Sequence, residues 1–195
     1  MRTKQRKDVK TRRWTKAEYY RLGELGFFDG QRVELIEGRL MVLSPQNRLH
    51  AGMVERLDCV IRELFGTGYR FRAQLPLDLG QTTEPEPDFV VGVGVPLAAT
   101  TTGHPTRALL VIEVSESTLR YDQGDKASLY ARAGVWDYWI INLVDNQVEI
   151  YRDPVPDPAH LWGFRYASRV DLVPPAQVAP LALPGRTIAV ADLLP

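Results

Sequence analysis

Cysteine is almost absent from this chain of 195 residues, which contains only Cys59. One thiol cannot form an internal disulfide bond, and cysteines cannot supply the ligands of a zinc site here. No apolar run approaches the ~20 residues of a membrane-spanning helix, and no apolar segment of a signal peptide follows the basic N-terminus. We therefore expect a soluble cytoplasmic protein without a membrane partner.

Net charge is also absent, because 24 basic side chains balance 24 acidic ones, but the distribution is uneven. Residues 1–16 carry eight basic side chains and one acidic, which leaves 16 basic and 23 acidic in the remainder. Such an arm can bind phosphates by releasing counterions, although a solvated tail is an equally good interpretation. An acidic body is unusual for a passive DNA-binding module, but it suits a nuclease, in which carboxylates gather around metal.

The length and the composition, 45% hydrophobic and 25% charged, are typical of one globular domain. We expect a flexible basic arm at residues 1–14 and a single domain at residues 15–195. Thr15 and Glu18 have the spacing of a capping box, which predicts that a helix begins there. Two apolar runs around Glu37-Gly38 predict a β-hairpin over residues 33–43.

Apolar residues at spacings of three and four, from Leu49 to Leu64, predict a helix over residues 47–65 that ends at Gly66. Alternating apolar and polar side chains then predict a strand over residues 69–79. The remaining expected elements are strands at 88–93, 108–114, 138–143 and 148–151, a helix at 123–133, and weaker strand patterns at 164–172 and 186–190.

From residue 47 onward, this order is a helix, three strands, a helix and a strand. It predicts an α/β fold with a mixed sheet flanked by helices. An N-terminal β-hairpin and antiparallel C-terminal strands extend that core. We expect residues 96–107, which are rich in Thr, Gly and Pro, to form a loop, and such a loop could determine specificity for a ligand or substrate.

Two carboxylates stand near the ends of strands that are expected to be neighbours. Asp88 opens one strand, and Glu113 lies near the end of the next. Because neighbouring strands lie about 4.8 Å apart, both could share one Mg²⁺, which prefers oxygen ligands and keeps several waters. Glu113 interrupts an apolar run, so it needs a partner, which could instead be Arg107 or Arg120.

Lys126 follows Glu113 by 13 residues, on the helix that succeeds the strand. The first turn of that helix can approach the carboxyl end of the strand, where a lysine could orient an attacking water or stabilise developing charge. Taken alone, Asp88 is better interpreted as a turn residue after prolines, and Lys126 as a solvated helix residue. The order of the three residues favours a site.

Several stretches of the chain, covering most of residues 15–151, recur in one known group of proteins. They are Val-Glu-Leu-Ile-Glu-Gly (33–38), Ser44-Pro45 followed by His50, Pro-Glu-Pro-Asp-Phe-Val-Val (85–91), the stretch 111–122 that begins Val-Ile-Glu-Val-Ser, Lys126, and Tyr-Ala-Arg-Ala-Gly-Val-Trp-Asp-Tyr-Trp-Ile (130–140). This ordered set resembles the PD-(D/E)XK nuclease superfamily and, within it, is similar to the Uma-two family of bacterial restriction endonucleases.

The resemblance implies that Asp88 and Glu113 are the two acids of the motif and that they bind Mg²⁺ or Mn²⁺. The lysine of the motif would stand two residues after Glu113, where this chain has Ser115. Lys126 on the following helix is the matching replacement.

Three further residues follow from the same resemblance. Glu34 matches the glutamate of the Glu-Leu-Ile-acid-Gly stretch and would be a further catalytic residue or ligand, with Glu37 as its rival at the turn. His50 tends to recur in the family, and we expect it beside the site. Ser115 and Glu37 are expected in similar supporting positions.

The sequence thus predicts a metal-dependent endonuclease that hydrolyses phosphodiester bonds of DNA, with a homodimer as its expected form. Fold does not determine function, and two alternatives stay open. One is a catalytically degenerate nucleic-acid-binding or regulatory module on a nuclease fold. The other is a homo-oligomeric interaction protein that uses its aromatic C-terminal half.

Overall fold

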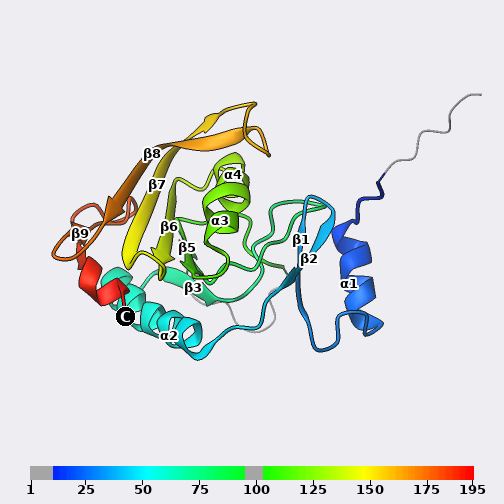
Figure 1. The fold of residues 1–195 in the computed structure, drawn as a ribbon, viewed down its shortest axis with the longest axis horizontal. Helices are drawn as coiled ribbons and strands as arrows, with labels where there is room; N and C mark the ends of the chain where they lie inside the picture. Colours follow the sequence, from blue (N-terminus) through cyan, green and yellow to red (C-terminus); the bar gives the residue numbers. More distant parts are fainter. Residues whose placement is uncertain (1–10, 95–102) are drawn as a thin grey trace, which may run out of the picture. The chain divides into compact units, whose positions relative to one another are not determined.

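The structure, a computed structural model, describes residues 11–94 and 103–195 (Figure 1). Contacts gather in two compact units, one formed by the chain up to Ser44 with Leu79–Pro85, the other by Pro45–Asp78 with Glu86–Pro195. Most of the expected basic arm and residues 96–102 of the expected loop lie outside the described residues. No helix in the described part of the chain is long and apolar enough to cross a membrane.

The N-terminal unit contains helix α1 (Lys16–Glu24) and the antiparallel hairpin of β1 (Arg32–Ile36) and β2 (Arg39–Leu43). The capping box is confirmed, because Glu18 N donates to Thr15 Oγ1 at 3.3 Å and Thr15 N donates to Glu18 Oε2 at 2.9 Å. The predicted hairpin is also confirmed. Its turn residues, Glu37 and Gly38, have φ of 50° and 73°, as a two-residue turn between twisted strands requires.

The second unit is built on a six-stranded sheet in the order β3-β4-β5-β6-β7-β8 (Figure 1). These strands are Tyr69–Ala73, Phe89–Val93, Leu110–Ser115, Asp137–Asn142, Gln147–Pro156 and Phe164–Leu172. Strands β5 and β6 are parallel, and every other neighbouring pair in this sheet is antiparallel. The predicted mixed sheet with antiparallel C-terminal strands is therefore confirmed.

Helix α2 (Arg48–Phe65) packs on one face of this sheet and buries Met53, Leu57 and Ile61 against it. The Asn47 side chain caps the helix by accepting from His50 N at 2.9 Å. Leu49, which we expected in the apolar stripe, is 45% exposed because it lies in the first turn, beyond the packed core. The short strands β9 (Gln177–Val178) and β10 (Ile188–Ala189) and the 3₁₀ turn η2 (Val190–Leu193) complete this core.

A second helical segment joins β5 to β6 and covers the opposite face of the sheet. It consists of α3 (Leu119–Tyr121), a π-helical turn η1 (Asp122–Lys126) and α4 (Ala127–Arg132). Alternation along β5 explains the two faces: Ile112 and Val114 join the core under α2, so Glu113 and Ser115 point to the other side.

Several predicted boundaries were wrong. The strand expected over 148–151 extends to Pro156 as β7, and the strand expected over 186–190 comprises Ile188–Ala189 before a 3₁₀ turn begins. The strand expected over 69–79 ends at Ala73, because Gln74 adopts φ of 52° and turns the chain out of the sheet. Leu75 is 46% exposed, whereas Leu77 is fully buried, so the alternation beyond Ala73 does not belong to a strand. The helix expected over 123–133 begins at Leu119 instead. The apolar pattern did not indicate its first turns, because they bury the polar side chain of Asp122.

Candidate active site

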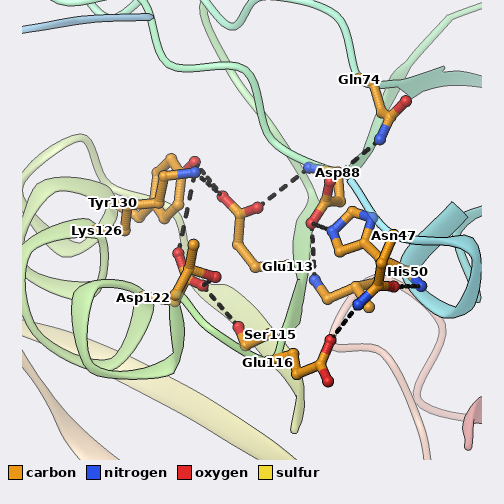
Figure 2. Close-up of polar contacts among 12 residues, drawn as sticks. Asn47, His50, Gln74, Asp88, Glu113, Ser115, Glu116, Asp122, Lys126 and Tyr130 are labelled. Atoms are coloured by element: carbon orange, nitrogen blue, oxygen red, sulfur yellow. Dashed lines mark hydrogen bonds and ion pairs between the residues drawn. The ribbon is translucent and has the colours of Figure 1, made fainter. Parts of the chain in front are cut away.

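The sheet brings Asp88 and Glu113 together, as the sequence predicted. Asp88 directly precedes β4, whose Phe89 pairs with Ile112 of β5, so Asp88 lies beside Glu113. Asp88 N donates to Glu113 Oε2 at 3.2 Å, and Val114 N donates to Asp88 Oδ2 at 2.9 Å (Figure 2). The two side chains are buried, with 7% and 2% of each residue exposed. Two carboxylates thus share one enclosed position at the edge between neighbouring strands.

Lys126 completes this group from the helical segment. Its Nζ donates to Glu113 Oε1 at 2.9 Å, and Tyr130 Oη donates to the same oxygen at 2.8 Å (Figure 2). Lys126 is only 5% exposed. The partner of Glu113 is therefore Lys126 rather than Arg107 or Arg120. Lys126 lies in the second helical turn after β5, not in the first as expected.

The π-helical turn explains how Lys126 reaches Glu113. In this turn Ala127 N donates to Asp122 O, a bond that spans one residue more than in an α-helix. Tyr138 Oη also donates to this carbonyl oxygen at 3.0 Å and fixes it against β6. Both Asp122 and Lys126 are buried as a result, and Lys126 Nζ lies 4.0 Å from Asp122 Oδ1.

Ser115 occupies the position that the superfamily motif gives to lysine, and it has a different partner. Its Oγ donates to Asp122 Oδ2 at 2.7 Å, and Thr118 Oγ1 donates to the same oxygen at 2.6 Å. The serine thus anchors the π-helical turn that carries Lys126. Sequence reasoning assigned no role to Asp122 or Tyr130, although Asp122, Lys126 and Tyr130 recur every four residues, as one helix face would require.

His50 and Gln74 hold the other carboxylate. His50 Nε2 lies 3.1 Å from Asp88 Oδ2, and Gln74 Nε2 donates to Asp88 Oδ1 at 3.4 Å (Figure 2). His50 Nδ1 is buried and has no hydrogen-bond partner among the described residues. His50 therefore lies beside the carboxylates as the resemblance implied, whereas Gln74 was not predicted.

Glu34 and Glu37 lie in the N-terminal unit. Glu34 is fully buried in β1. Glu37 stands in the hairpin turn, and its Oε1 accepts from Thr83 Oγ1 at 2.5 Å. The role of Glu34 as a further catalytic residue stays a prediction.

Burial and neighbouring charges shift the pKa values of Asp88, Glu113 and Asp122 in different directions. Burial raises the pKa of Glu113 to about 8, although Lys126 opposes the shift. Burial also raises the pKa of Asp122. Burial acts in the same direction on Asp88, but His50, the Val114 N–H and the charge of Lys126 together outweigh it and hold the pKa of Asp88 below its ordinary value. Three buried carboxyls therefore share one ammonium group.

This excess of acid is what a divalent cation would neutralise. The described residues contain no group of three or more His, Cys, Asp or Glu side chains arranged to hold a metal. Two carboxylates nevertheless fit Mg²⁺, which takes few protein ligands and keeps several of its waters. Asp88 and Glu113 are the two carboxylates that would serve as donors to such an ion.

The raised pKa of Glu113 predicts how stability depends on pH when no metal is bound. The pKa of this carboxyl is 4.5 ordinarily and about 8 in the folded protein. Between these values only the folded protein retains the proton, so stability that is complete below the lower value is lost as pH approaches the upper. We expect a slope of up to about 1.4 kcal/mol per pH unit.

Urea denaturation in EDTA at several pH values between these limits measures this slope. The matched variant Glu113→Gln has no proton to lose, so its free energy of unfolding should depend less on pH by that amount. Parallel pH profiles for the two proteins would contradict the assignment.

The central mixed sheet, with paired carboxylates and a lysine at one edge, defines a restriction-endonuclease-like fold. The chain belongs to the Uma2 family, described as "Putative restriction endonuclease", which matches residues 17–191. A crystal structure of a "putative nuclease belonging to DUF820" from Anabaena variabilis ATCC 29413 has a similar fold. Its TM-score is 0.64 at 17% identity, over 83% of this chain and 88% of that one. No protein of curated function matches the sequence significantly.

Proposed function

We propose that this protein is an endonuclease that hydrolyses phosphodiester bonds of DNA with Mg²⁺ or Mn²⁺. One observation carries the proposal. Asp88 N donates to Glu113 Oε2 between the neighbouring strands β4 and β5, and Lys126 Nζ lies 2.9 Å from Glu113 Oε1. Membership of the Uma2 family supports nuclease chemistry.

Asp88 and Glu113 are the residues that would hold the metal ion. When bound, such an ion polarises the scissile phosphate and lowers the pKa of a water. Glu113 must be deprotonated to act as a ligand. Because its pKa is about 8, binding of the metal ion should release a proton close to neutral pH.

The other residues of the site have distinct tasks. Lys126 places a positive charge where negative charge grows on the phosphate during attack, and it can hold the attacking water. Tyr130 orients Glu113 through its hydroxyl hydrogen bond. His50 keeps Asp88 ionised and points its carboxylate toward β5. These two are positioning residues, because each acts through a carboxylate.

Cleavage of supercoiled plasmid DNA tests the proposal directly. The wild-type protein should nick or linearise the plasmid with Mg²⁺ or Mn²⁺ and should be inactive in EDTA. Asp88→Asn keeps the shape of the side chain but removes the charge that a cation needs. We expect its cleavage rate to fall about a hundredfold or more.

Asp171→Asn is the matched control, because this exposed carboxylate pairs with Arg169 on the surface strand β8. Its rate should equal that of the wild type. If wild-type protein cleaves neither single- nor double-stranded DNA with either metal, the non-catalytic binding module becomes the better reading. Cleavage that survives Asp88→Asn would place the metal site elsewhere. A homodimer, which would match the symmetry of duplex DNA, stays a prediction.

A further inference from the structure

Three arginines surround one pocket on the sheet of the second unit. Arg70 and Arg72 come from β3, and Arg107 lies on the segment before β5. The rest of the lining is Val90, Gly92, Val93 and Pro105, none of which carries a charge. Arg107 is exposed, and the other two arginines are partly exposed, so the pocket is open to a ligand.

The register of β3 and β4 places these side chains on the face opposite the core under α2. Arg70 pairs with Gly92 and Arg72 with Val90, whereas the alternate residue Phe71 packs against that core. Gly92 leaves the floor of the pocket open. A Cβ there would meet nothing closer than the carbonyl oxygens of Arg107 at 3.8 Å and Arg70 at 4.0 Å.

The positive charge of the pocket is not neutralised within the described part of the chain. No ion pair joins Arg70, Arg72 or Arg107 to any carboxylate there. Arg72 Nη2 lies 3.0 Å from His104 Nδ1. Because arginine can only donate, His104 accepts this bond and brings no compensating charge.

The guanidinium of Arg72 is also incompletely hydrogen-bonded. Its Nε is buried and has no partner among the described residues. Burial, with the nearby charge of Arg70, lowers the pKa of Arg72. Like charges gathered around a pocket repel one another, and a bound anion would relieve that repulsion. Guanidinium groups match the geometry of phosphate oxygens particularly well, because they donate two parallel hydrogen bonds.

The pocket lies along the same two strands as the candidate active site. Gln74, two residues beyond Arg72, donates to the carboxylate of Asp88, and Asp88 lies two residues before Val90, the partner of Arg72. At about 3.3 Å per strand residue, Arg72 stands about 7 Å along the strands from the catalytic carboxylate and Arg70 about 13 Å. A nucleic-acid strand that enters the active site would pass this pocket.

We propose that Arg70, Arg72 and Arg107 bind a phosphate group of the DNA backbone next to the scissile bond. The inference rests on the proposed nuclease function, because it names where that substrate is held. The remainder of the chain beyond residue 16 has seven more acidic than basic side chains. The pocket therefore supplies attraction that the body as a whole does not, and backbone contacts of this kind position a nucleic acid without reading its sequence.

Fluorescence anisotropy with a labelled 30-bp duplex tests this, with the full chain in EDTA so that binding is measured without cleavage. Arg70→Gln/Arg72→Gln should weaken binding at least about tenfold, and the slope of log K against log salt should fall by about two. The control Arg21→Gln/Arg186→Gln removes the same charge from exposed arginines that bond Glu24 and Leu64 O. It should leave both values close to wild type.

A third variant, Arg70→Lys/Arg72→Lys, keeps the charge and guards against misfolding. It should retain the salt slope while binding more weakly than the wild type. Equal loss in the Gln variant and its control would overturn the proposal. So would binding of 10 mM inorganic phosphate that the Gln variant loses while its affinity for the duplex stays at the wild-type value, because the pocket would then bind a small anion and not the DNA backbone. Failure of plasmid cleavage would instead count against the nuclease function and leave the binding result intact.

Discussion

Lys126→Ala should reduce metal-dependent DNA cleavage by about two to four orders of magnitude. The ammonium group lies directly beside the candidate metal ligands, with its Nζ 2.9 Å from Glu113 Oε1. Without it, the charge that grows on the phosphate loses one of the cations that would stabilise it beside the metal ion. Steady-state plasmid cleavage at saturating Mn²⁺ measures the loss. Lys16→Ala, in the first turn of α1, is the matched control and should have no effect.

A relocated lysine makes this prediction sharper. Glu113 and Ser115 point to the same face of β5, so the superfamily motif would place its lysine beside the same carboxylate. Ser115→Lys combined with Lys126→Ala should recover part of the lost rate, while Ser115→Lys alone should not exceed wild type. Thermal unfolding must show that each variant is folded. If Lys126→Ala cleaves at the wild-type rate, the lysine serves only to compensate buried charge.

Asp137→Ala should lower the free energy of unfolding by about 3–5 kcal/mol, the usual cost of breaking a buried charged pair. Asp137 is fully buried at the start of β6. Its carboxylate accepts from Trp139 Nε1 at 2.7 Å, Arg152 Nε at 2.8 Å and Leu181 N at 2.7 Å. Removal of the carboxylate leaves these three donors without this acceptor, and it removes the hydrogen bond that ties Leu181 of the C-terminal segment to β6.

Urea denaturation followed by far-UV circular dichroism measures the effect. Asp171→Ala removes a carboxylate of the same kind from an exposed pair with Arg169, and it should cost about 0–1 kcal/mol. Similar losses in the two variants would show that Asp137 does not have the structural role assigned to it. Asp137→Asn keeps an acceptor and should fall between them.

The fold was largely predictable, because its signals are local. The capping box at Thr15, the turn at Glu37-Gly38 and the stop at Gly66 each depend on a few adjacent residues, and each is confirmed. Asp88, Glu113 and Lys126 were also predictable, since strand order places their elements together. The family resemblance indicated which of the many acidic and basic residues correspond to the motif.

Other features depend on contacts between distant segments, which local patterns do not report. The strand ends at Gln74 because this residue adopts a positive φ. No glycine, asparagine or aspartate stands there to predict such a turn from the sequence. Tyr130 and Asp122 join the site because the helical segment contains a π-helical turn. The arginines on β3 read as the exposed side of an amphipathic strand. Their meaning appears only when Arg107 and the uncharged residues of β4 are placed beside them.

The π-helical turn also bears on how such sites change over generations. A π-helical turn holds one residue more between its hydrogen-bonded groups than an α-helical turn does. Deletion of Gly124 would remove that residue, so the segment would close with the shorter hydrogen bond of an α-helix and would change how Asp122 and Lys126 face each other. A single codon thus separates the two forms of this turn.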